Sequence, residues 1–203
     1  MRPIDELLRE GITAGQFGGE SKPHGDQAMG FVAFSDNPEN DFAGHVIDIG
    51  SGAGLPALVL AEAFPKTSWT LVERRVGRTD LLRRAVQRLG FTDRVDVRSE
   101  DVTVAARSSL RGSGDWVTAR SFGPPGDTAE CAAPFLREGG CLLTSEPFDG
   151  DLETRWPQPG LERVDLSLVN QWETTVGRYA RFVRGGALIE DLPRRGSRKK
   201  LLF

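Results

Sequence analysis

One segment, residues 45–56 with the sequence HVIDIGSGAGLP, constrains the fold of this chain more than any other. It begins with a short apolar run, Val46–Ile49, and leads into a second apolar run, Leu55–Phe64, with the composition of a helix. Between them lie Gly50, Gly52 and Gly54. Glycine allows positive φ and lets a ligand approach the backbone N–H groups at a helix N-terminus. The segment therefore predicts a strand, a turn and a helix that together form a nucleotide-type cofactor loop.

The spacing of the glycines indicates which cofactor this loop binds. A dinucleotide loop has the pattern G-x-G-x-x-G, whereas this chain has G-x-G-x-G with Leu55 at the place of the third glycine. An acid inside the first strand, Asp48, favours S-adenosylmethionine over NAD. Glu73 ends a second predicted strand about twenty residues further on, where a carboxylate can accept hydrogen bonds from both ribose hydroxyls.

Composition limits the class of protein. The 203 residues suit one domain, and no apolar stretch is long enough to span a bilayer, so we expect no membrane association. The charged first ten residues lack the apolar core of a secretory signal, which predicts a cytoplasmic protein. Cys131 and Cys141 have no metal-ligand spacing, so we predict no metal site. A net charge of −3 excludes coating of nucleic acid by net charge alone, but a local basic patch remains compatible with RNA contact.

The middle of the chain alternates strands and helices in the manner of a doubly wound α/β sheet. Parallel strands are expected at Val46–Ile49, Trp69–Glu73, Val95–Arg98, Trp116–Ala119 and Cys141–Thr144. Helices are expected at Leu55–Phe64, Gly77–Leu89, Val102–Leu110 and Gly126–Leu136. An antiparallel pair is expected at Val164–Trp172 and Tyr179–Val183. We predict a short helix at Pro3–Arg9 and loop or disorder over Arg9–Asn40.

Several motifs occur together in an order that resembles one family. They are D-I-G-S-G-A-G-L-P at residues 48–56, L-V-E-R at 71–74, R-S-E-D at 98–101, V-T-A-R at 117–120 and P-R-R-G-S-R-K-K at 193–200. Over residues 45–203 the chain resembles the glucose-inhibited division protein B family, the ribosomal RNA small subunit methyltransferase G enzymes. The resemblance implies a class I S-adenosylmethionine-dependent methyltransferase fold, Rossmann-like, with a mostly parallel seven-stranded sheet and a C-terminal antiparallel strand pair.

The same resemblance implies transfer of the methyl group of S-adenosylmethionine to N7 of a guanine in the decoding region of 16S rRNA. The partner would be 16S rRNA or a precursor of the small ribosomal subunit, and we expect a monomer. Guanine N7 has an in-plane lone pair and no proton, so it needs no general base. We therefore predict no acid–base or nucleophilic side chain, and expect orientation of the reactants to supply the rate.

The candidate cofactor-binding residues are Asp48, Gly50, Ser51, Gly52, Ala53, Gly54, Leu55, Glu73, Ser99, Glu100 and Arg120. Arg120 follows the fourth strand at the ligand-binding edge, so it is also our substrate-side candidate; the alternative is a salt bridge to Asp115 or Asp127. Ser99 and Glu100 stand where this fold meets the adenine, with helix capping by Ser99 as the alternative.

Two further features bear on RNA. Five cations predicted to contact RNA phosphates lie within seven residues near the end of the chain: Arg194, Arg195, Arg198, Lys199 and Lys200. A second basic cluster, part of which is expected to be a solvated helix face, contains Arg74, Arg75, Arg78, Arg83, Arg84 and Arg88. For Asp48 we favour hydrogen bonds to the N–H groups of its own loop over contact with the methionine ammonium.

We divide the chain into an N-terminal extension with a role in substrate recognition (residues 1–43), a methyltransferase domain (44–192) and a basic tail (193–203). Two alternatives remain open. One is a methyltransferase of the same fold that acts on a small molecule or another RNA, which the acidic overall balance favours. The other is a non-catalytic RNA- or ribosome-binding protein, which a failure to bind the cofactor would favour.

Overall fold

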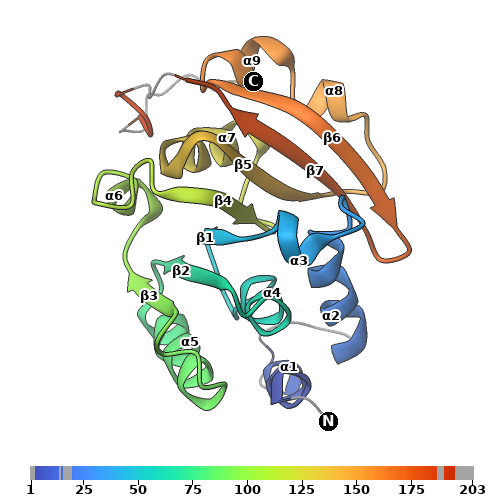
Figure 1. The fold of residues 1–203 in the computed structure, drawn as a ribbon, viewed down its shortest axis with the longest axis vertical. Coiled ribbons are helices and arrows are strands. Elements are labelled where there is room, and N and C mark those ends of the chain that lie inside the picture. The colour runs from blue at the N-terminus through green and yellow to red at the C-terminus, as the bar shows by residue number, and fades with distance from the viewer. Residues whose placement is uncertain (1–2, 14, 16–19, 187–189, 195–203) are drawn as a thin grey trace.

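A seven-stranded sheet forms the middle layer of the molecule, with strand order β3-β2-β1-β4-β5-β7-β6 (Figure 1). The structure is a computed structural model that describes residues 3–13, 15, 20–186 and 190–194. The strands are β1 (Gly44–Ile49), β2 (Thr67–Glu73), β3 (Val95–Ser99), β4 (Gly114–Ala119), β5 (Leu136–Glu146), β6 (Leu166–Thr174) and β7 (Gly177–Arg184). Strands β1 to β5 pair in parallel, and β7 is antiparallel to both β5 and β6. The predicted sheet, with its C-terminal antiparallel pair, is confirmed.

Helices cover both faces of the sheet (Figure 1). One face carries α1 (Pro3–Thr13), α2 (Ser21–Gly30), α3 (Pro38–Asp41), α4 (Ala57–Ala63) and α5 (Val76–Arg88). The other carries α6 (Val102–Ala105), α7 (Pro125–Ala132), the 3-10 turn η1 (Ala133–Phe135), α8 (Leu152–Arg155) and α9 (Gln158–Glu162). Each face of the sheet has its own hydrophobic core. Val46 packs in the core beneath α1, α4 and α5, and Ile47 packs in the core beneath α6 and α7, because successive side chains of a strand point to opposite faces.

The N-terminal region is more regular than the sequence predicts. Helix α1 extends past Arg9, and α2 lies within the stretch that we expected to be loop or disorder. Phe31, directly after α2, is fully buried with its ring edge-on to Tyr179 at a centroid distance of 5.2 Å. The indole of Trp172 donates to the carbonyl of Gly30 at 2.7 Å. The prediction was wrong because α2 is stabilised by docking on β6 and β7 and not by its own sequence.

Several boundaries differ from the predicted ones, and the short helices α3, α8 and α9 were not expected. Helix α6 makes one turn and ends at Ala105 instead of Leu110. Helix α7 ends at Ala132, and β5 begins at Leu136 because a bulge in β5 between Leu136 and Cys141 allows Leu136 to pair with Gly114 ahead of the main register. The short helices α8 and α9 occupy a stretch for which we predicted no element.

The strand order reverses between β1 and β4, and ligands bind at the carboxyl ends of the strands at such a switch point. Asp48 lies near the carboxyl end of β1, Glu73 at the end of β2, and Arg120 directly after β4. The topology therefore places three of the predicted side chains along one edge of the sheet.

Candidate cofactor and acceptor site

A cavity of about 340 Å³ lies at this edge of the sheet, and we call it the cofactor cavity. Its walls are Gly50, Val72, Glu73, Arg74, Arg75, Arg78, Glu100, Asp101, Val102, Ser121 and Phe122. Gly50, Glu73 and Glu100 belong to the predicted cofactor set. Ser121 and Phe122 follow β4 and do not, because no motif marks them.

Gly50 cannot be replaced by a larger residue without a local shift. Its φ is +67°, and a Cβ atom at this position would lie 2.8 Å from Cδ2 of Phe122. The N–H groups of Gly50 and Ser51 both donate to the carbonyl of Val72, at 2.9 and 3.1 Å. The loop is thereby fixed to β2, with the ring of Phe122 against its backbone.

Glu73 joins the glycine loop to the start of α5. Its buried carboxylate accepts from the Gly52 N–H through Oε2 at 3.0 Å and from the Arg75 N–H through Oε1 at 2.8 Å. A carboxylate oxygen has two lone-pair sites, so each oxygen can accept one further hydrogen bond. The arrangement fits the prediction that Glu73 receives the two hydroxyls of a ribose.

Asp48 is buried directly behind the loop and has one carboxylate oxygen in use. Oδ1 accepts from the Thr118 hydroxyl at 2.6 Å, while Oδ2 is buried and has no hydrogen-bond partner among the described residues. Burial raises the pKa of Asp48 to about 7, although the Thr118 hydroxyl, Ser51 and the charge of Arg120 act in the opposite direction. A buried, unpartnered carboxylate oxygen beside a ligand loop suits a cationic group such as the ammonium of S-adenosylmethionine.

Our preferred role for Asp48 is therefore corrected. We expected its carboxylate to bind the N–H groups of its own loop, but those groups have other acceptors: Val72, Glu73 and the Ser51 carbonyl. The carboxylate of Asp48 accepts from a hydroxyl of the neighbouring strand β4 instead.

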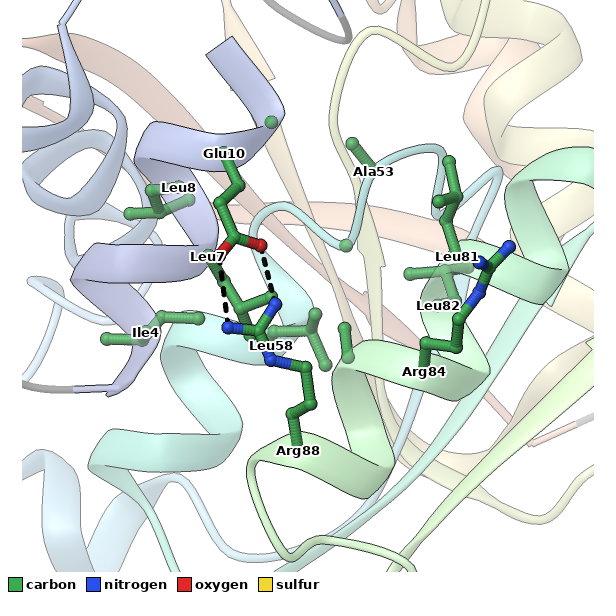
Figure 2. Close-up of a pocket in the computed structure, with 13 residues that line it drawn as sticks. Ile4, Leu7, Leu8, Glu10, Ala53, Leu58, Leu81, Leu82, Arg84 and Arg88 are labelled. Carbon is green, nitrogen blue, oxygen red and sulfur yellow. Dashed lines mark hydrogen bonds and ion pairs between the residues drawn. The ribbon is translucent and has the colours of Figure 1, made fainter. Parts of the chain in front are cut away.

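The second half of the loop faces away from the cofactor cavity. Ala53 and Gly54 line a separate cavity of about 290 Å³ between α1, α4 and α5, which Figure 2 shows together with the ion pair of Arg88 and Glu10 at its rim. A Cβ atom on Gly54 would lie 2.5 Å from Cδ1 of Leu58. These residues serve the packing of helices behind the loop.

The other two predicted loop residues also make contacts within the protein. The Ser51 hydroxyl donates to the backbone carbonyl of Asp48 at 2.9 Å. Leu55 is partly buried against the core that contains α4. Neither residue lines the cofactor cavity as the described residues define it.

The turn after β3 contributes acids to the cavity. Glu100 lines it as predicted, and Asp101 lines it as well. Ser99 accepts a hydrogen bond from the Thr79 hydroxyl at 3.1 Å. Capping of α6 by Ser99 is wrong, because the N-cap is Asp101, whose Oδ1 accepts from the Thr103 N–H at 2.9 Å.

Arg120 lies between the sheet and α2. Its Nη2 donates to Nδ1 of His24 at 3.3 Å, and this partner lies on the unexpected helix α2. Among the described residues Arg120 forms neither of the salt bridges that we gave as alternatives, and Asp115 pairs instead with Arg137 at 2.7 Å. A half-buried arginine near Asp48 at the sheet edge remains suited to a substrate-side role.

A second cavity of about 320 Å³ lies at the carboxyl ends of β4 and β5, and we call it the acceptor cavity. Its walls are Gln27, Ala119, Ser121, Phe122, Gly123, Pro125, Thr128, Thr144, Ser145, Glu146, Pro147, Arg155 and Trp156. Ser121 and Phe122 line both cavities, so the two are adjacent. No local sequence pattern indicates this cavity, because α2, β5 and α8 form it together.

The predicted RNA-contacting residues lie in two environments. The Arg194 N–H and Nη2 both donate to the buried carboxylate of Glu130, at 2.6 and 2.7 Å, so this guanidinium is held by the protein. Four predicted residues, Arg195, Arg198, Lys199 and Lys200, lie outside the described residues.

The arginines around α5 divide into paired and unpaired groups. Arg83 and Arg88 pair with Asp80 and Glu10, and Arg84 donates to the Asp80 carbonyl. Three others, Arg74, Arg75 and Arg78, are exposed at the mouth of the cofactor cavity, and their side chains have no ion pair with any part of the chain that the structure describes.

The sheet with its reversal at β1 and β4, the glycine loop, the ribose-side acid Glu73 and the unpartnered oxygen of Asp48 define a class I S-adenosylmethionine-dependent methyltransferase. A sequence model of the family described as rRNA small subunit methyltransferase G matches residues 28–146. The chain belongs to this family, as its motifs predict, and the family and fold confirm S-adenosylmethionine as the predicted cofactor.

Relatives in this family share the central part of the chain. The Ribosomal RNA small subunit methyltransferase G of Synechococcus sp. (strain CC9311) is 39% identical over 115 residues, which are 56% of this chain and 45% of the relative. That of Salinispora arenicola is 43% identical over 101 residues, which are 48% of this chain and 42% of the relative. The chain thus matches less than half the length of these relatives.

Solved structures show the same fold at low sequence identity. The O-methyltransferase from Bacillus cereus in complex with SAH has a TM-score of 0.65 at 14% identity and covers 90% of both chains. An O-methyltransferase family protein from Burkholderia thailandensis has a TM-score of 0.59 at 16% identity, over 82% of this chain and 56% of that one. Within the described residues no helix has the length and apolar character needed to cross a membrane.

Proposed function

We propose that this protein transfers the methyl group of S-adenosylmethionine to N7 of a guanine in 16S rRNA. The main support for this proposal is that the two cavities are adjacent. Phe122 lines both the cofactor cavity and the acceptor cavity. Family membership supports an rRNA acceptor. A 16S rRNA substrate also implies a cytoplasmic protein.

The chain's own residues would bind and orient the reactants. Glu73 would accept hydrogen bonds from the ribose hydroxyls, Oδ2 of Asp48 would accept one from the ammonium, and the loop backbone at Gly50 would lie against the methionine portion. When bound, S-adenosylmethionine supplies a methyl group on a positively charged sulfur. Guanine N7 would form a bond to the methyl carbon with a lone pair that carries no proton, while the bond from this carbon to sulfur breaks and S-adenosylhomocysteine leaves. The protein has only to align the two reactants and exclude water.

Contact with the RNA backbone would occur beside the cofactor cavity. The exposed guanidiniums of Arg74, Arg75 and Arg78 are not neutralised by described acids, in contrast to those of Arg83 and Arg88 further along α5. Unpaired cations at the mouth of a site suit phosphate groups, which position the nucleic acid. The predicted tail contacts would add to them.

The activity is tested on small subunits from a strain that lacks this gene. The purified protein and S-adenosylmethionine are added, and nucleosides from the 16S rRNA are analysed by mass spectrometry. We expect 7-methylguanosine to appear with the wild type and not with Glu73→Ala. Methylation of a different nucleoside, or a guanine-N7 mark that the gene deletion leaves unchanged, would refute the assignment. Binding of the cofactor with no methylation of RNA would favour a small-molecule acceptor.

The RNA surface is tested by the salt dependence of binding. Replacing Arg74, Arg75 and Arg78 together by Ala should reduce the slope of log K against log salt by about 2 to 3, at about 0.7 to 0.9 for each phosphate contact. The control variant, Arg83, Arg84 and Arg88 replaced by Ala, has the same change in charge. Equal slopes in the two variants would contradict this surface. The tail prediction is tested in the same way with the four residues beyond Arg194.

A further inference from the structure

The acceptor cavity contains a carboxylate and a guanidinium whose arrangement suits one kind of base. The side chain of Glu146 at the end of β5 is 3% exposed, and that of Arg155 at the end of α8 is 34% exposed. Both line the cavity together with Thr128, Thr144 and Trp156. At about 320 Å³ the cavity lies at the lower end of the range of ligand sites, about 300 to 1,000 Å³.

The carboxylate of Glu146 is fixed from two sides. Oε1 accepts from the Thr144 hydroxyl at 2.6 Å, and Oε2 accepts from Nε of Arg155 at 3.0 Å. Each oxygen has two lone-pair sites, so one site on each oxygen is unused. A buried carboxylate that its neighbours hold in place is a preorganised acceptor for two N–H donors side by side.

Arg155 supplies donors next to this acceptor. The only hydrogen bond of its side chain to the described residues uses Nε, which leaves both Nη groups for a ligand. The cavity therefore offers acceptor sites and donor sites in neighbouring positions. Its walls also include Phe122 and Trp156, which are suited to the faces of a planar ring.

We infer that Glu146 and Arg155 recognise the Watson–Crick edge of the guanine that is to be methylated. Among the RNA bases only guanine presents two adjacent N–H donors, N1–H and the 2-amino group, next to a carbonyl acceptor, O6. Glu146 accepts from the two donors, and an Nη group of Arg155 donates to O6. This inference rests on the proposed function only in its choice of acceptor.

The assignment also agrees with the chemistry of N7. This atom lies on the Hoogsteen edge of guanine and not on the Watson–Crick edge, so a base held by its Watson–Crick edge leaves N7 free to react. A paired guanine cannot present that edge, and the target must therefore be unpaired or extruded from its helix, as enzymes that act on bases in nucleic acids require. The structure thus assigns Glu146 and Arg155 a role in specificity.

Titration with mononucleotides tests this inference without RNA and without methyl transfer. GMP, IMP and AMP are titrated into the full chain saturated with S-adenosylhomocysteine. GMP should bind about 5- to 150-fold more tightly than AMP, the range expected for one bidentate contact, with IMP between them because it lacks only the 2-amino group. Glu146→Gln should bring GMP and AMP to within about two-fold of each other.

Two further variants separate recognition from folding. The matched control is Glu173→Gln, which alters an exposed carboxylate on β6 and should leave the order of affinities unchanged. If Glu146→Gln does not fold, Arg155→Met decides, because it removes the donor to O6 and should weaken GMP more than AMP. Equal affinities for GMP and AMP in the wild type, absence of saturable GMP binding, or a preference for GMP that survives both variants would overturn the inference. Selective GMP binding without methylation of 16S rRNA would refute the proposed substrate alone.

Discussion

Protonation of Asp48 should control the affinity of this protein for S-adenosylmethionine. Burial raises the pKa of this carboxyl to about 7, and its Oδ2 has no partner within the described protein. The ionised form can attract an ammonium group, whereas the neutral form cannot. If only the ionised form binds, the apparent dissociation constant equals the intrinsic one divided by the ionised fraction.

The magnitude follows from that pKa of about 7. The ionised fraction is about 0.03 at pH 5.5 and about 0.5 at pH 7, so the affinity should rise about 15-fold, or about 1.6 kcal/mol, across this range. The amino group of the ligand remains largely protonated throughout, because α-amino groups titrate at about 7.7 to 8.0. Calorimetric titration of the wild type and of Asp48→Asn measures the effect. The variant should bind more weakly at pH 7 and with no such rise.

An equal rise in both proteins would refute the reasoning, because it would show that the titrating group is not Asp48. A flat profile in the wild type would refute it as well. Stability provides an independent check. Because the folded-state pKa is raised, stability from this group is fully present below about pH 4 and is lost as pH rises through about 7, by about 4 kcal/mol in all. Asp48→Asn should therefore melt at a higher temperature than the wild type at pH 8, and this difference should shrink towards pH 4.

Four other variants give three separate tests. Glu73→Gln offers one acceptor oxygen to two backbone N–H donors, so chemical unfolding should show a loss of about 1 to 3 kcal/mol of stability. Cofactor binding should weaken by a similar free energy, at least ten-fold in affinity. Unchanged stability and affinity would contradict the described contacts. Gly50→Ala should impair cofactor binding, whereas Gly54→Ala should mainly lower the melting temperature and leave the cofactor affinity of the folded fraction nearly intact. Weaker binding by Gly54→Ala than by Gly50→Ala would show that the two faces of the loop are misassigned. Arg194→Ala removes a charge-assisted hydrogen bond from a side chain that is 33% exposed, so we expect a loss of about 1 to 2 kcal/mol and a melting temperature lower by about 2 to 8 °C, which differential scanning calorimetry would detect.

Local sequence was sufficient to predict those elements whose stabilising residues are close together in the chain. The apolar run of β1, the glycines and the apolar residues of α4 follow one another in the chain, so their pattern identifies the strand, the loop and the helix together. Glu73 was found for a similar reason, because its distance from the loop is set by one helix and one strand. Seven strands and the final antiparallel pair followed from the family motifs and from the change of pattern after residue 146.

The remaining features depend on residues that meet only in the folded chain. Helix α2 is held by Tyr179 and Trp172 from the far end of the chain, so its own polar sequence gave no sign of it. Glu146 and Arg155 come from different elements, and nothing in their spacing indicates a cavity. The requirement for glycine at residue 50 includes contact with Phe122, which no local pattern reveals.

The glycine loop faces a different cavity on each side, and this affects how its sequence should be interpreted. Gly50 is constrained by Phe122 in the wall of the cofactor cavity, whereas Gly54 is constrained by Leu58 in the cavity that Figure 2 shows. Nearby residues of one motif therefore meet two separate requirements, ligand binding and helix packing. A relative that keeps the glycine at position 50 and replaces the one at position 54 has changed how its helices pack. Retention of the whole motif therefore indicates conserved helix packing as much as it indicates binding of a nucleoside.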